Sequence, residues 1–80
     1  MPTVFRDGGF RFFFYSNEGS PREPAHIHVE KTNLEAKFWL SPEVRVALND
    51  GYDARTLREL LIIVEENRDR IERTWDEFFS

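Results

Sequence analysis

Apolar and polar residues alternate along the first half of the chain, a pattern typical of β-strands that bury one face. The alternation predicts strands at residues 3–6, 10–15, 26–31, 34–40 and 43–48. The last of these segments could also form a short helix. Asp7-Gly8-Gly9 is a strong turn signal because glycine adopts positive φ without a Cβ clash, so the first two strands should form a hairpin. The stretch that follows the second strand, residues 16–25, should be the longest loop.

The last third of the chain repeats its apolar residues with the period of a helix. These residues are Leu57, Leu60, Leu61, Val64, Ile71, Trp75 and Phe78. With Arg68 filling the gap in the series, they form one buried stripe. Asp53 is a good N-cap, and neither Pro nor Gly interrupts residues 54–79. One uninterrupted amphipathic helix is therefore expected there.

The two halves together predict an α+β fold in one domain, residues 1–80. An antiparallel sheet of four to five strands, about residues 3–48, should be packed on one face by the long C-terminal helix, about residues 54–79. No internal repeat or linker divides the chain.

The alternation also sorts the strand residues onto two faces of the sheet. One face is almost entirely apolar and holds Phe10, Phe12, Phe14, Ile27, Val29, Leu34, Ala36, Phe38, Leu40, Val44, Val46 and Leu48. The second, which we call the polar–aromatic face, holds Arg11, Phe13, Tyr15, His26, His28, Glu30, Glu35, Lys37, Trp39, Glu43 and Arg45. Because one helix can cover only one face, the polar–aromatic face should be open to solvent or to a partner.

Three aromatic residues on this face, Phe13, Tyr15 and Trp39, would be costly to expose, since burying each gains about 1.5–3 kcal/mol. A cluster of exposed aromatics usually marks an interaction site. The expected interaction residues are Arg11, Phe13, Tyr15, His26, His28, Lys37, Trp39 and Arg45. Alternatively, the aromatics pack under the long loop or form a minor core. A bulge would move part of a strand to the other face.

Both histidines of the chain lie on this face, at His26 and His28. Imidazoles titrate near neutrality, so the pair could act as acid and base, with Arg11, Lys37 or Arg45 binding a phosphate. With Glu30 they form a row, His-x-His-x-Glu, which is a weak candidate for a metal site. The structural alternative is that the imidazoles hydrogen-bond the loop backbone beside Pro24.

Charge and composition narrow the function classes. The net charge of −4 comes entirely from residues 41–80, since residues 1–40 hold five Lys/Arg and five acids. The helical half is thus a poor nucleic-acid surface, and a polyanion would bind the other half. The absence of Cys excludes disulfides, thiolate metal sites and a Cys nucleophile. No apolar run could span a bilayer, and the N-terminus lacks a signal-peptide pattern, so a cytoplasmic protein without a membrane partner or a cofactor is expected.

Several segments carry a resemblance to a known family. They are residues 1–4, 12–18, 24–29, 36–40, 51–52 and 64–67, together with Trp75. In order and over nearly the whole chain, they resemble the small bacterial family catalogued as domain of unknown function 4160. Family members usually read Pro-Pro-His where this chain has Pro24-Ala25-His26. The resemblance implies no established activity, but it implies a gene context beside another small protein, as in toxin–antitoxin pairs.

The leading expectation is therefore an interaction protein, one partner of a toxin–antitoxin-like pair. It would bind a small protein encoded nearby, or a second copy of itself, through the polar–aromatic face. The alternatives are an RNA-directed toxin or nuclease that uses His26 and His28, and a weak metal-binding protein. Binding is expected rather than catalysis.

Overall fold

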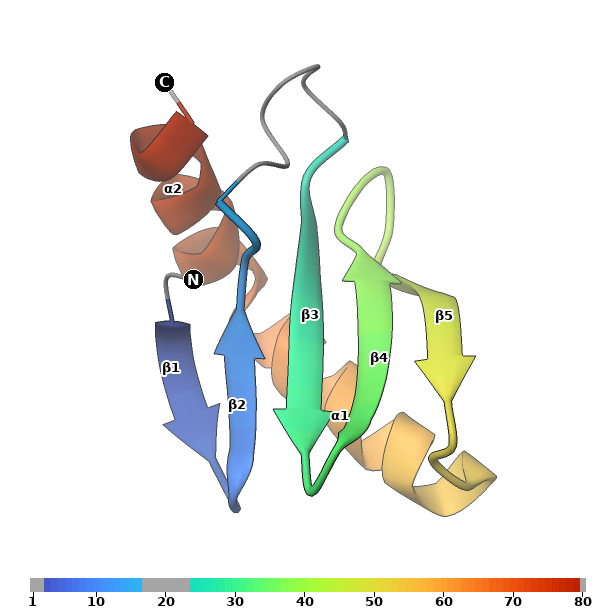
Figure 1. Cartoon of the computed structure of the whole chain (residues 1–80). Helices are drawn as coiled ribbons and strands as arrows, with labels where there is room; N and C mark the ends of the chain where they lie inside the picture. The colour runs from blue at the N-terminus through green and yellow to red at the C-terminus, as the bar shows by residue number, and fades with distance from the viewer. Residues whose placement is uncertain (1–2, 17–23, 80) are drawn as a thin grey trace.

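The computed structural model describes residues 3–16 and 24–79 (Figure 1). Five antiparallel strands form one sheet in chain order: β1 (Thr3–Asp7), β2 (Phe10–Phe13), β3 (His26–Lys31), β4 (Leu34–Trp39) and β5 (Arg45–Asp50). Two helices, α1 (Ala54–Glu66) and α2 (Arg68–Phe79), lie behind one face of this sheet. The predicted α+β class is confirmed. Most of the expected long loop, residues 17–23, lies outside the described residues.

The hairpin turns fix the register of the strands. Gly8 and Gly9 have φ of 58° and 84°, and Thr32 and Asn33 have φ of 51° and 67°. Two successive positive φ values are typical of the two-residue turns that match the twist of antiparallel strands. The β3–β4 ladder then runs one to one from Lys31↔Leu34 to His26↔Trp39. Side chains on the two strands therefore lie directly opposite one another.

The core lies between the sheet and the helices. The sheet contributes Phe12, Phe14, Ile27, Val29, Ala36, Phe38 and Leu40, and the helices contribute Leu60, Val64, Ile71 and Trp75. All of these sheet residues come from the face that was expected to be apolar. Because large side chains from both layers are fully buried, this burial is the main source of stability.

A bulge in β5 changes the predicted faces. Leu48 lies opposite Lys37 and Val46 lies opposite Phe38, so Ala47 is an extra residue in the ladder. Leu48 therefore turns to the polar–aromatic face, where it is 54% exposed, and its expected place in the core is wrong. Val46 faces the helix layer but is still 43% exposed at the sheet edge.

The single long helix that was expected is broken at Asn67. The Asn67 backbone N–H lies 3.1 Å and 3.2 Å from the carbonyl oxygens of Ile63 and Val64, and its side chain donates to the Ile63 carbonyl at 2.8 Å. The backbone bond to Ile63 is the regular helical one, and the side-chain amide competes with it for the same carbonyl oxygen. Beyond the break, Phe79 rather than Phe78 packs on the core. Within the described residues, neither helix is long and apolar enough to cross a membrane.

The connection from β5 to α1 is held by polar contacts. The Tyr52 hydroxyl donates to the Leu34 carbonyl oxygen at 2.6 Å, and partial burial raises the pKa of Tyr52. Asp53 is the N-cap of α1, as predicted, and accepts the Thr56 N–H at 2.8 Å. That backbone hydrogen bond holds the pKa of Asp53 below its ordinary value. Through the Tyr52–Leu34 hydrogen bond, the segment just before α1 is held against the end of the β3–β4 turn.

Candidate functional site

The polar–aromatic face has a buried inner layer, formed by Phe13, His26 and His28. Phe13 and His26 are fully buried, and His28 is only 6% exposed. These side chains come from β2 and β3, where Phe13 lies opposite His28. Their rings pack on one another: Phe13 stacks on His28 at 5.5 Å between centroids, and His28 meets His26 at 5.1 Å. Phe13 and His26 were expected to be interaction residues, but both are buried and cannot contact a partner directly.

Other residues of the same face form an outer layer over these rings, namely Arg11, Tyr15, Lys37 and Trp39. The Arg11 guanidinium lies 4.0 Å from the Phe13 ring centroid. The Tyr15 ring meets the His28 ring edge to face at 4.6 Å between centroids. The Lys37 ammonium lies 4.4 Å from the Trp39 ring centroid. The minor core that was one alternative for this face is therefore present, and the outer layer is half-buried.

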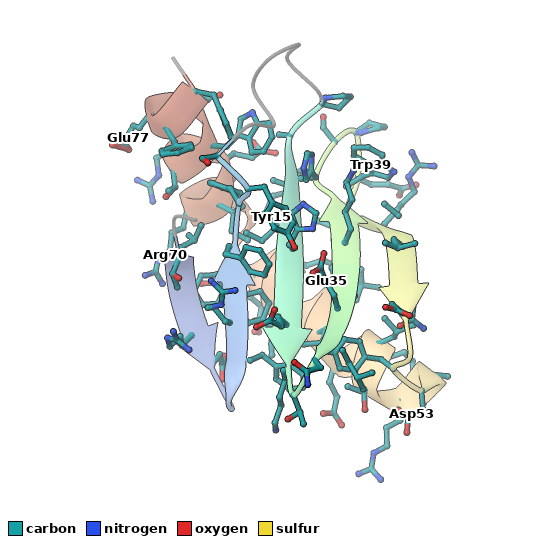
Figure 2. The ribbon with its side chains drawn as sticks, in the orientation of Figure 1. Tyr15, Glu35, Trp39, Asp53, Arg70 and Glu77 are labelled. Carbon is teal, nitrogen blue, oxygen red and sulfur yellow. The ribbon has the colours of Figure 1, made fainter. Side chains whose placement is uncertain are left out.

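Glu35 connects three strands at the centre of the face. Its Oε1 accepts a hydrogen bond from the Tyr15 hydroxyl at 2.8 Å, and its Oε2 lies 3.1 Å from Nδ1 of His28. Figure 2 shows Tyr15 and Glu35 side by side on the surface of the sheet away from the helices. An ionised carboxylate can only accept, so Nδ1 of His28 is the donor in this contact.

Sequence reasoning placed Glu35 on this face but gave it no role. The available signal was the short Thr32-Asn33 turn, which fixes the β3–β4 register and puts Glu35 diagonal to His28. The hydrogen bond to Tyr15 could not be predicted, because it depends on a side chain crossing the intervening strand.

His26 joins the two faces of the sheet. Its Nδ1 lies 2.8 Å from the carbonyl oxygen of Pro24 and must donate to it. The imidazole also packs against Trp75 of α2, at 4.8 Å between centroids, and against Trp39, at 5.6 Å. The interpretation that an imidazole bonds the backbone beside Pro24 is confirmed. His26 holds the start of β3 and has no exposed surface from which to act on a substrate.

The expected His-x-His-x-Glu row does not converge. Glu30 points to Arg11, with 3.5 Å between Oε1 and the guanidinium, while His28 is bonded to Glu35. Among residues 3–16 and 24–79, no group of three or more His, Asp or Glu side chains could hold a metal ion. The metal-site hypothesis for His26, His28 and Glu30 is therefore not supported.

The outward-facing part of the face is an aromatic strip flanked by cations. Trp39 is half-buried on β4, with Lys37 over its ring and Arg45 directly opposite on β5. Arg45 itself is exposed, and Leu48 adds an exposed apolar side chain beside Lys37. Tyr15 lies toward the other side of the face (Figure 2). The geometry suits binding of a flat, amphipathic partner surface rather than enclosure of a small molecule.

Comparison with known proteins identifies a family for this chain. No curated protein and no solved structure matches it. Residues 9–76, nearly the whole chain, match the family described as domain of unknown function DUF4160. This range contains α1, most of α2, four of the five strands and every residue of the inner and outer layers. The chain therefore belongs to the DUF4160 family.

Proposed function

We propose that this protein is the binding member of a two-protein module of the toxin–antitoxin type, and that it docks a partner protein on the outer layer of its polar–aromatic face. The observation that carries the proposal is the state of Tyr15 and Trp39. Both rings are half-buried, and both are held by contacts within the chain. Tyr, Trp and Arg are the residue types that dominate binding energy at protein interfaces.

The contacts within the outer layer favour binding because they restrict its side chains in advance. The Tyr15 hydroxyl is hydrogen-bonded to Glu35, and the Trp39 ring contacts both the His26 ring and the Lys37 ammonium. Side chains that are already ordered lose less conformational entropy when a partner docks. A partner can then bury the accessible aromatic surface with little further loss of conformational entropy.

The charges around Trp39 indicate the chemistry of the partner. Lys37 and Arg45 flank the ring, whereas Arg11 on the other side of the face is near Glu30. A surface with an apolar centre and carboxylates at its margin complements this arrangement. The small protein expected beside this gene is the first candidate, and the cytoplasm is the compartment in which we place the pair.

Co-purification tests this proposal. Wild-type protein should retain the product of the neighbouring gene, and Tyr15→Ala and Trp39→Ala should lose it. Phe78→Ala is the matched control, since it removes an exposed ring from α2 on the other side of the molecule. Circular dichroism must show that all variants fold. Equal retention by the wild type and both face variants would contradict the proposal.

RNA cleavage is the second candidate, and one observation favours it. The Glu35–His28 pair is a carboxylate–imidazole arrangement suited to proton transfer, and Lys37 lies opposite His28. The burial of both imidazoles argues against it, because a phosphodiester would have to displace the outer layer. In this case His28→Ala should abolish RNA cleavage or growth inhibition. Activity that persists in a folded His26→Ala/His28→Ala variant would exclude this reaction.

A further inference from the structure

β5 is an edge strand with a surface unlike that of the other edge. It pairs only with β4 among the described strands, and its exposed apolar residues are Val46 and Leu48. An edge strand offers unpaired backbone groups along its outer side. The opposite edge, β1, is different: its central Phe5 is half-buried, stacked on Phe12 at 4.4 Å and covered by Arg70 of α2.

The bulge at Ala47 gives β5 a self-complementary charge pattern. Arg45 and Asp50 would lie on opposite faces of a regular strand, because successive side chains alternate and the two positions are an odd number of steps apart. With the extra residue they share the polar–aromatic face, opposite Trp39 and Glu35 of β4 respectively. Neither side chain makes an ion pair with another described residue. Asp50 instead lies opposite Glu35 in the ladder, and like charges directly opposite are unfavourable.

We infer that β5 pairs with β5 of a second copy of this chain, in antiparallel orientation about a two-fold axis perpendicular to the sheet. The register that fits places Arg45 of each copy opposite Asp50 of the other. It also places Val46 opposite Asn49 and Ala47 opposite Leu48. Cross-strand neighbours must share a face, and two of the pairs meet that condition: Arg45 and Asp50 lie on the polar–aromatic face, and Val46 and Asn49 lie on the helix side. Two ion pairs then flank an apolar centre, and Arg45 of each copy offsets the like charges of Asp50 and its ladder neighbour Glu35 on the other copy.

The layer behind the sheet leaves room for this pairing. α1 begins below β5 and crosses diagonally behind β4 and β3, so it does not run along the outer side of β5 (Figure 1). The 43% exposure of Val46 on the helix side is consistent with this incomplete cover. Pairing would join the two sheets into one and bring the two polar–aromatic faces side by side. This inference shares Arg45 and Leu48 with the proposed docking face, but it rests on the free edge of β5 and does not depend on the proposed function.

Charge reversal tests the register directly. Wild-type protein should dimerise with increasing concentration in sedimentation or light scattering, and less so at high salt. Arg45→Asp alone and Asp50→Arg alone each place like charges together, and should raise the dimer Kd about tenfold or more. The double variant Arg45→Asp/Asp50→Arg should restore the dimer. An equimolar mixture of the two single variants should also dimerise, because each then supplies the charge that the other lacks.

The other outcomes overturn the inference. A wild type that stays monomeric at every concentration shows that no such pairing occurs. If both single variants still dimerise, the contact lies on another surface. The same conclusion holds if the double variant keeps the wild-type circular dichroism spectrum but does not regain the dimer. Leu48→Lys, which puts a charge at the apolar centre, should abolish the dimer without unfolding, since Leu48 is 54% exposed. A dimer unaffected by it would also contradict the inference.

Discussion

The Tyr15 hydroxyl donates a hydrogen bond to Glu35 across the strand between them, at 2.8 Å. Tyr15 follows β2 and Glu35 belongs to β4, so the contact spans β3 and covers His28. Because of this contact, the polar–aromatic face has two layers of side chains, a buried inner layer and a half-buried outer layer. The same contact holds Tyr15 in the position from which we propose that it meets a partner.

The hydrogen bond should contribute measurably to folding. Tyr15→Phe keeps the ring over His28 but removes the donor to Glu35, and we expect it to lower the free energy of unfolding by about 1–2 kcal/mol. Urea denaturation followed by circular dichroism measures this. Glu35→Gln provides the comparison, because it keeps an acceptor for the hydroxyl. A Tyr15→Phe variant as stable as wild type would show that the bond is not formed in solution.

The inner layer should behave as a second core. Phe13→Ala should destabilise the protein by about 3–5 kcal/mol, comparable with Phe12→Ala in the main core, because both rings are fully buried. A loss of less than about 1 kcal/mol for Phe13→Ala would mean that the ring faces solvent. Denaturant midpoints of the two variants, measured side by side, distinguish these cases.

The sequence predicts which residues share a face of the sheet, but it does not predict bulges or contacts between strands. The period of two located His26, His28 and the apolar face correctly, because burial of one face imposes that period. Leu48 was misplaced because an extra residue at Ala47 reverses the alternation, and no Gly or Pro signals it. The burial of Phe13 was not foreseen, since it depends on long side chains from two strands folding over it.

The helix break was missed for a related reason. Asn67 is compatible with a helix, and its effect comes from the hydrogen bond to the Ile63 carbonyl. The neighbouring Arg68 also bonds the Pro42 carbonyl oxygen at 3.1 Å, a contact between segments far apart in the sequence. Patterns within one segment do not contain such information.

The break makes a prediction about the two final phenylalanines. Phe79 packs against Phe14 and Trp75, whereas Phe78 is 43% exposed. Phe79→Ala should therefore lower the free energy of unfolding by about 2–3 kcal/mol, and Phe78→Ala by about 0.5 kcal/mol or less. Thermal unfolding of both variants checks this order. The reverse order would indicate the continuous helix that the sequence alone predicts.

Acid should weaken the start of α1 through Asp53. The folded pKa of this carboxyl is lowered by the Thr56 N–H, so its ionised form stabilises the fold above its ordinary pKa of 3.8. That contribution is lost as the pH falls through the lower, folded pKa. Asp53→Asn keeps an N-cap acceptor but cannot titrate, and its stability should lack this component.

Urea denaturation of the wild type and of Asp53→Asn, at neutral pH and at successively more acidic pH, compares the two. The difference in stability between them should shrink as the pH falls. A constant difference across the acid range would mean that the cap carboxylate does not favour the folded state.

Trp39 is the residue on which the proposed interface depends most, and calorimetric titration with the neighbouring gene's product measures its contribution directly. We predict that Trp39→Ala raises Kd about tenfold or more while Phe78→Ala leaves it within about twofold of the wild type, since a central interface Trp typically contributes more than about 1.4 kcal/mol. Equal Kd values for wild type and Trp39→Ala, or no binding by the wild type, would show that Trp39 does not bind this partner.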